Sequence, residues 1–186
     1  MPIKSTSSSY GSIAITLHWL MAMLVLILIV SGFRAAGTTI ADAKAAILMV
    51  HAPVGITVLL LLIFRIVWWL FFDKKPQTIG GQPRWQELSA RIVHYAFYGV
   101  LLLMTASGIG MFVLSGAGPI LFGGTDAALP NFNELAPRTP HGIGARLLIA
   151  LVVLHAGAAI YHQFVRKDGL LSRMWFDRDR TKKDIQ

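Results

Sequence analysis

The chain has 186 residues, of which 55% are hydrophobic and only 14% are charged, and its mean hydropathy is +0.61. A soluble domain carries roughly 25% charged residues, so this deficit argues against an ordinary globular enzyme and indicates a membrane protein. The absence of cysteine excludes covalent c-type haem attachment, cysteine-ligated iron–sulfur clusters, thiolate zinc sites and disulfides. The net charge of +8 is expected to mark segments beside anionic lipid, and we expect no nucleic-acid partner.

Four apolar stretches are each long enough to cross a hydrocarbon layer of roughly 30 Å as a helix. They cover about 12–33, 45–72, 88–114 and 141–165, and each is bounded by Gly, Pro, Asp or basic residues. We therefore predict an all-α integral membrane protein, a four-transmembrane-helix bundle, with residues 1–186 forming a single membrane domain. The Ser-rich start at 5–9 is expected to be a disordered tail. The first stretch is expected to be an uncleaved helix, because its apolar region is too long for a signal peptide.

The distribution of Lys and Arg predicts the orientation of the bundle. If the N-terminus lies in the cytoplasm, twelve Lys and Arg fall in the two tails and the 73–91 loop, whereas only Arg34, Lys44 and Arg138 fall on the opposite side. Such an excess is typical of cytoplasmic segments. Both termini are therefore expected in the cytoplasm, with 166–186 as a basic tail. The Gly- and Pro-rich segment 115–140 is expected to form a cap on the outer face.

All six histidines fall inside or at the mouth of a predicted helix. They are His18, His51, His94, His141, His155 and His162. Ionisable side chains at membrane depth are unfavourable and are functional candidates by default, although a single one could be structural packing. On the fourth helix, His141 and His155 are fourteen residues apart, which returns to nearly the same face about 21 Å further along the axis. One helix face therefore presents imidazoles towards both sides of the bilayer.

Depth along the helices groups the histidines across the bundle. His51 and His141 both lie near the outer face, and His18 lies towards the cytoplasm, where depth alone allows either His155 or His162 as its partner. Two histidines on facing helices can hold a haem iron between them. Pairs at two depths therefore predict two haems and a path for electrons across the membrane. With both axial positions of the iron filled, such sites suit electron transfer better than oxygen binding.

Two arginines and the remaining histidines complete the candidate site. Arg65 and Arg146 lie within predicted spans without an obvious carboxylate partner. Haem propionates would supply one through charge-assisted hydrogen bonds, and the alternative is that these side chains snorkel to an interface. Near the cytoplasmic surface, His94 and His162 could donate hydrogen bonds to a quinone whose tail remains in lipid. The alternative for these two histidines is that they cap helix ends or bind propionates.

The ordered set of these residues resembles the bacterial cytochrome b561 family of four-helix dihaem membrane cytochromes, from Ser12 to Arg173. The resemblance is carried by 16–20, 51–55 with Arg65, the tyrosine-flanked His94, 140–142, 154–156 with His162, and 166–168. It implies two haem b groups, one bound by His18 with His155 and the other by His51 with His141. It also implies a bacterial inner membrane and exchange of electrons with ubiquinone.

We therefore expect a dihaem cytochrome b that carries single electrons, and the family resemblance implies oxidation of superoxide at the outer face as one activity. A different hypothesis is a haem-bearing membrane anchor that conducts electrons for a soluble dehydrogenase or hydrogenase. A remote alternative is a haem-free ion transporter. Such a transporter would be expected to carry intramembrane carboxylates, and all nine Asp and Glu fall outside the apolar stretches.

Overall fold

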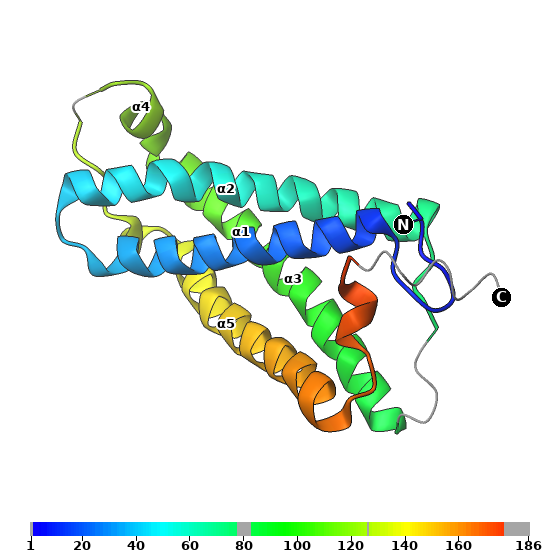
Figure 1. Ribbon diagram of the computed structural model, residues 1–186. Helices are drawn as coiled ribbons and strands as arrows, with labels where there is room; N and C mark the ends of the chain where they lie inside the picture. The colour runs from blue at the N-terminus through cyan, green and yellow to red at the C-terminus, as the bar shows by residue number, and fades with distance from the viewer. Residues whose placement is uncertain (1, 78–82, 126, 177–186) are drawn as a thin grey trace.

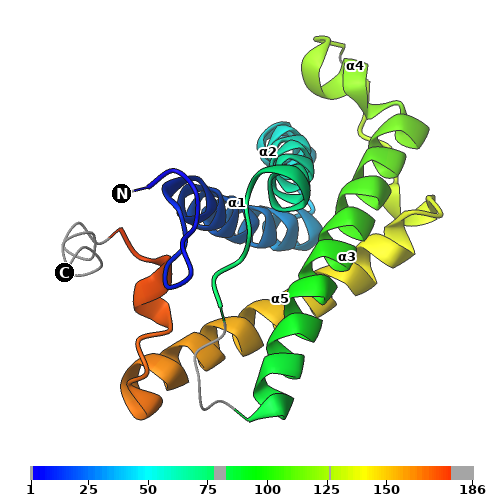
Figure 2. The same ribbon diagram turned by 90° about the vertical axis from the view of Figure 1, so that its right-hand side faces the viewer.

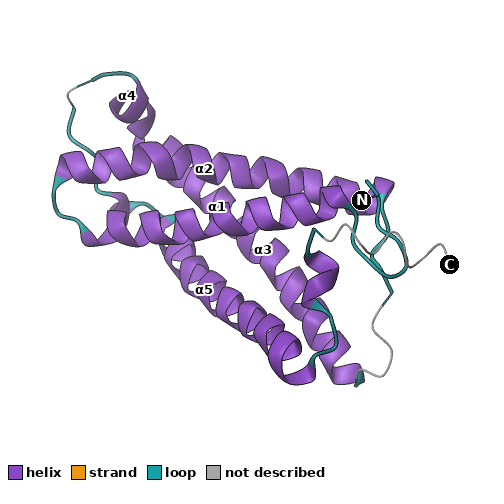
Figure 3. Ribbon diagram, in the orientation of Figure 1, coloured by secondary structure: helices purple, strands orange, loops and turns teal. Residues whose placement is uncertain are grey.

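The computed structural model describes residues 2–77, 83–125 and 127–176, and every regular element in these ranges is helical (Figure 3). The long helices are α1 (Ser12–Gly37), α2 (Ala41–Val67), α3 (Arg84–Ser115) and α5 (Arg138–Tyr161). α2 and α5 continue into the π-helical turns η1 (Trp68–Phe72) and η3 (His162–Arg166). With these turns included, all four are long and apolar enough to cross a membrane. The predicted all-α bundle of four membrane-spanning helices is thus confirmed.

The helices extend beyond the apolar stretches from which they were predicted. α1 continues to Gly37, α2 begins at Ala41, α3 begins at Arg84 and α5 begins at Arg138. These extra turns contain polar and charged residues, which lower the hydropathy without preventing backbone hydrogen bonding. Only residues 38–40 separate α1 from α2, and such a short connection makes the two helices antiparallel neighbours.

The bundle consists of two helix pairs, α1 with α2 and α3 with α5 (Figure 1). Figures 1 and 2 show that the pairs cross and that they diverge towards the end at which α1 begins and α5 ends. We call this the terminal end, and it contains Ser12 and Arg84. The opposite end, which contains the α1–α2 turn and the start of α5 at Arg138, is called the loop end.

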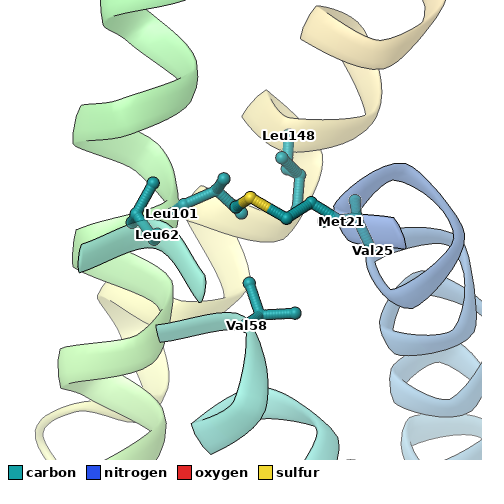
Figure 4. Close-up of a cluster of buried hydrophobic side chains, with 6 residues drawn as sticks. All are labelled: Met21, Val25, Val58, Leu62, Leu101 and Leu148. Carbon is teal, nitrogen blue, oxygen red and sulfur yellow. The ribbon is translucent and has the colours of Figure 1, made fainter. Parts of the chain in front are cut away.

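A cluster of apolar side chains joins the two pairs at mid-height. Its members are Met21, Val25, Val58, Leu62, Leu101 and Leu148 (Figure 4). All four long helices contribute to it, and Val58 and Leu62 are fully buried. The outward surfaces of the same helices expose many large hydrophobic side chains, which is the pattern expected of helices that face lipid. The cluster therefore forms a dry layer between the two ends of the bundle.

The segment after α3 folds over the loop end. Gly116 ends α3 in the left-handed conformation, with a φ of 63°, which glycine adopts without steric penalty. The short helix α4 (Ala117–Phe122) follows and packs against α2 and α3, with Ala117 and Leu121 buried. The 3₁₀ turn η2 (Phe132–Glu134) then leads towards α5. This segment therefore caps the loop end, and its place on the outer face stays a prediction.

At the terminal end, the expectation of a disordered Ser-rich tail was wrong. The buried carboxylate of Asp73 accepts hydrogen bonds from the backbone N–H of Ser5 at 3.0 Å, from its hydroxyl at 2.8 Å and from Trp68 Nε1 at 3.2 Å. Arg173 Nε donates to the carbonyl of Ser8 at 2.7 Å. A polar composition suggested disorder, but a buried carboxylate at the end of η1 provides acceptors that order the segment.

The start of the predicted basic tail is also held against the bundle. A 3₁₀ turn, η4 (Leu171–Met174), follows the end of η3, and Trp19 Nε1 of α1 donates to the carbonyl of Met174 at 2.8 Å. The N-terminal segment 2–11, the segment 73–77 and the segment 167–176 together are called the terminal cap. The remaining basic residues of the predicted tail, Arg178, Arg180, Lys182 and Lys183, lie outside the described residues.

Candidate haem-binding histidines

The structure brings His51 of α2 and His141 of α5 together at the loop end. Their ring centroids are 6.4 Å apart and the ring planes are inclined by 66°. A first-row metal lies about 2 Å from each imidazole nitrogen that binds it, so a metal held between two imidazoles places their centroids roughly 6 Å apart. The rings are therefore separated by a distance that suits one iron between two axial ligands, with one ligand from each helix pair.

A second pair lies at the terminal end. His18 of α1 and His155 of α5 have ring centroids 5.9 Å apart with planes inclined by 63°, so this pair meets the same spacing criterion. Of the two partners that depth allowed for His18, the structure places His155 against it. His94 of α3 lies next to this pair, with its ring centroid 5.5 Å from that of His155. His18, His94 and His155 are called the terminal-end histidines.

His162 is engaged locally. Its Nδ1 lies 2.5 Å from a carboxylate oxygen of Asp168, which the left-handed conformation of Lys167 at φ 52° turns back towards η3. Burial opposes ionisation of Asp168, but the hydrogen bonds from His162 and from the N–H of Leu170 outweigh it and lower the pKa of the carboxyl. The two histidines predicted as a quinone site thus have different neighbours, Asp168 for His162 and His155 for His94.

Two serines that were not predicted as site residues hold the loop-end histidines. Ser31 Oγ of α1 lies 2.8 Å from His51 Nδ1, and Ser107 Oγ of α3 lies 3.0 Å from His141 Nδ1. Each hydroxyl also donates to the carbonyl four residues earlier in its helix, at 2.7 and 2.6 Å. Because the hydroxyl proton is used there, we infer that each serine oxygen accepts the Nδ1–H of its histidine. This tautomer leaves Nε2 free to bind a metal.

The backbone supports the same tautomer at His141. Its Nδ1 lies 3.1 Å from the carbonyl oxygen of Met104, and a carbonyl can only accept a hydrogen bond. A glycine follows each serine and leaves room for the ring. A Cβ at Gly32 would lie 3.2 Å from Cε1 of His51, and a Cβ at Gly108 would lie 3.4 Å from Cε1 of His141. At both sites, the Ser-Gly pair thus supplies an oxygen that accepts the Nδ1–H bond and a glycine that lets the imidazole ring approach the helix closely.

An internal repeat is the sequence signal that could have revealed the serines. It relates α1 to α3 and α2 to α5. The matched positions are His18 and His94, Ser31 and Ser107, Gly32 and Gly108, His51 and His141, and Arg65 and His155. The serine stands thirteen positions after the histidine in α1 and in α3. In α2, Arg65 stands fourteen positions after His51, and in α5, His155 stands fourteen positions after His141. The chain is therefore built from two helix pairs with one pattern, in which an arginine in one pair corresponds to a histidine in the other.

The two arginines predicted near the haems lie in different environments. Arg65 is partly buried at the terminal end, where its Nε donates to the hydroxyl of Tyr98 at 3.4 Å. Its charge acts on all three terminal-end histidines. Arg146 is exposed on α5, and its guanidinium donates to the carbonyl of Gly142 at 3.4 Å. Arg65 is therefore part of a histidine cluster, whereas Arg146 lies on the outer surface of its helix.

A bundle of four membrane-spanning helices that places facing imidazoles at two levels has the architecture of a membrane-bound b-type cytochrome. The family model for prokaryotic cytochrome b561 matches residues 9–177 of this chain. The chain belongs to this family of membrane electron-transfer proteins, and membership implies b-type haem and a multi-pass membrane protein.

Curated relatives cover nearly the full length of the chain. It is 30% identical over 169 residues to a Yersinia pestis protein named "Probable superoxide oxidase CybB". The aligned region covers 89% of this chain and 94% of that relative. It is 30% identical over 184 residues to cytochrome b561 homolog 2 of Escherichia coli K12, covering 94% and 95% of the two chains. It is 28% identical over 171 residues to cytochrome b562 of Cereibacter sphaeroides, covering 89% and 94%.

Proposed function

We propose that this protein is a dihaem cytochrome b that carries single electrons across a bacterial inner membrane. The observation that supports it most strongly is the facing imidazole pair at each end of the bundle, with ring centroids 6.4 and 5.9 Å apart. His51 and His141 would hold one haem, and His18 and His155 would hold the other. Each haem would supply a one-electron iron couple.

The residues between the two levels keep the path dry. Leu148 stands seven residues from both His141 and His155, which is about 10 Å along α5 from each. It belongs to the apolar cluster with Val58 and Leu62, which are fully buried. These side chains exclude water and charged groups from the middle of the bundle. The proposed electron path therefore crosses an apolar layer between the two histidine pairs.

The proposed orientation places the terminal end in the cytoplasm. It rests on the excess of Lys and Arg, of which twelve fall on the terminal side and three on the loop side. Four of the twelve lie outside the described residues, and the remaining eight still exceed three. The loop end, with His51, His141 and the α4 segment, then faces the outside.

Ubiquinone is the proposed partner at the terminal end. His94 is exposed there and its ring lies 5.5 Å from that of His155, so it offers a hydrogen-bond donor beside the inner histidine pair. His162 and Asp168 form a second polar group near the membrane surface. Reduction of a quinone consumes two electrons and two protons, and protonatable side chains at the cytoplasmic surface can exchange those protons with water.

Superoxide is the proposed electron donor at the loop end. Two superoxide anions lose one electron each and leave as two molecules of oxygen, while one ubiquinone takes both electrons and two protons. The name of the Yersinia pestis relative supports this choice. The Lys and Arg on this side are Arg34, Lys44 and Arg138. Replacing all three by Gln is expected to slow reduction by superoxide roughly tenfold at low ionic strength, without loss of haem. An unchanged rate would contradict electrostatic delivery by these residues.

The proposed function is tested by a reduced-minus-oxidised visible spectrum of the purified protein with a pyridine haemochrome count. Two low-spin haems b per chain are expected. A colourless, folded protein would overturn the cytochrome proposal. Reduction by superoxide and oxidation by ubiquinone in the isolated chain would support the oxidoreductase activity. Co-purification of a soluble dehydrogenase or hydrogenase, with no superoxide reaction, would favour the anchor and electron-conduit role instead.

A further inference from the structure

We infer that Ser31 and Ser107 lower the reduction potential of the haem at the loop end below that of the haem at the terminal end. The inference rests on the proposed function, because it assumes one haem between each histidine pair. The two pairs have nearly the same ring spacing, so a difference in potential has to come from the groups that surround the rings. These groups differ in hydrogen bonding and in charge.

At the loop end, both axial rings donate hydrogen bonds through the nitrogen remote from the metal. His51 donates to Ser31 at 2.8 Å, and His141 donates to Ser107 at 3.0 Å and to the carbonyl of Met104 at 3.1 Å. An acceptor at Nδ1–H makes the imidazole a more basic ligand. A more basic ligand stabilises ferric over ferrous iron, and this lowers the reduction potential.

At the terminal end, the part of the chain that the structure describes contains no corresponding bonds. Within the described residues, the ring nitrogens of His18 and His155 have no hydrogen-bond partner. Their neighbours are aromatic instead. The ring centroid of His18 is 5.3 Å from that of Trp19, and the ring centroid of His155 is 5.5 Å from that of Phe97. Aromatic packing holds these rings without raising their basicity, so the potential at this end is not lowered in the same way.

Charge acts in the same direction. Arg65 is partly buried beside the terminal-end histidines, and a nearby cation stabilises the reduced iron, which carries one positive charge fewer. At the loop end, Arg138 is the cation that acts on His141. However, its Nε donates to Asn133 at 3.3 Å in an exposed contact, so solvent screens this charge. Hydrogen bonding and charge therefore both place the lower potential at the loop end.

The consequence is a preferred direction for electrons. An electron delivered at the loop end moves to a site of higher potential at the terminal end, which in the proposed orientation is from the outside towards the cytoplasm. The two haem sites lie in halves of one chain that are related by the internal repeat. In this repeat, Arg65 occupies the position that corresponds to His155. The two halves thus share a helix pattern and differ in the groups that set the potential.

The test is an optical redox titration of the purified holoprotein and its Ser31→Ala, Ser107→Ala and double variants. The expected result is an upward shift of the lower midpoint, with the higher midpoint unchanged. Ser31→Ala is expected to shift it more than Ser107→Ala, because His141 keeps the carbonyl of Met104. Ser31→Thr retains a hydroxyl and is expected to restore the wild-type midpoint. His51→Ala, which removes the loop-end haem, identifies which midpoint belongs to that site.

Ser89→Ala is the matched control. Ser89 also lies on α3 and its hydroxyl donates to the carbonyl four residues earlier, at 2.7 Å, but it is exposed and, among the residues that the structure describes, it has no hydrogen bond to a histidine. This variant is expected to leave both midpoints unchanged. If Ser31→Ala loses haem, Ser107→Ala carries the test, since the carbonyl of Met104 still orients His141. Two haems with no shift of the lower midpoint, or a shift confined to the higher one, would overturn the inference. Fewer than two haems in the wild-type protein would instead overturn the proposed function.

Discussion

Each end of the bundle holds a pair of facing histidine rings, but the side chains that surround the rings differ between the two ends. At the loop end, Ser31 and Ser107 accept hydrogen bonds from the histidine rings. At the terminal end, the rings pack against aromatic side chains and lie in the field of Arg65. The ring spacing of the two pairs differs by only half an ångström. The position of a histidine ligand and its basicity are thus set by separate groups.

The same contrast separates structural support at the two ends. The loop end is covered by α4, whose Ala117 and Leu121 are buried. The terminal end is covered by the terminal cap, which depends on polar contacts around Asp73. Apolar burial holds the α4 segment, whereas hydrogen bonds to Asp73 and from Arg173 and Trp19 hold the terminal cap. A substitution at Asp73 can therefore loosen the terminal end while leaving the loop end intact.

The largest expected effect comes from removing a ligand at one end only. His51→Ala and His18→Ala are each expected to lower the pyridine haemochrome count from two haems per chain to one. His162→Ala is expected to keep both haems, because His162 is hydrogen-bonded to Asp168 and the ring that faces His18 is that of His155. Loss of a haem in His162→Ala with retention in His155→Ala would reverse the pairing described for the terminal end.

A steric change next to a ligand is expected to act at the loop end alone. In Gly32→Val, the Cβ would stand 3.2 Å from the His51 ring and its methyl groups would come closer still. The ring then moves away from His141, and loss of most of the loop-end haem is expected. Gly99→Val is the control, since a Cβ at Gly99 would meet no atom within 4 Å. This substitution changes the helix propensity by a comparable amount. Equal haem loss in both variants would mean that helix stability, and not the ring contact, is responsible.

A charge change is expected to act at the terminal end alone. Arg65→Gln removes a partly buried cation, worth about 1–2 kcal/mol at an effective dielectric constant near 20. The higher midpoint is therefore expected to fall by roughly 50 mV, given 59 mV per tenfold change for one electron. Arg65→Lys keeps the charge and is expected to retain most of the potential, and Arg146→Gln removes an exposed charge and is expected to change little. A fall of the lower midpoint in Arg65→Gln would place Arg65 beside the other haem.

The smallest effect is a pH dependence in the terminal cap. The pKa of Asp168 is lowered in the folded protein, so its contact with His162 stabilises the fold above the ordinary carboxyl pKa of about 4 and is lost as the pH falls. Asp168→Asn is expected to lower the thermal midpoint slightly at pH 7, and by less at about pH 3. A difference of about 1 kcal/mol is expected for this part-buried hydrogen bond. A difference that grows as the pH falls would have the wrong sign.

Much of this architecture follows from the sequence because hydropathy and helical periodicity are properties of single segments. The four spans, the phase of His141 and His155, and the grouping by depth depend on counting along a helix. The internal repeat marks Ser31 and Ser107 as matched positions. Counting alone does not give their role, since a membrane serine that bonds only to its own helix backbone looks the same in the sequence. Their role depends on which helix faces which, and helix pairing is a tertiary property.

The error at the N-terminal segment has a similar cause. The Ser-rich segment was predicted to be disordered from composition, but Asp73, which is distant in sequence, supplies the acceptors that order Ser5. His94 and His162 were grouped because they share a depth. Depth does not give the direction in which a side chain points. The structure places His94 beside His155 and His162 beside Asp168, and a quinone site at these two histidines stays a prediction.

The most direct test of the account is an optical redox titration of the purified wild-type protein, with a pyridine haemochrome count on the same sample. Two haems b per chain and two resolved midpoints are expected, of which the lower one disappears in His51→Ala and the higher one in His18→Ala. Two haems with the opposite assignment would contradict the electronic difference between the two ends. One haem or none would contradict the dihaem site itself.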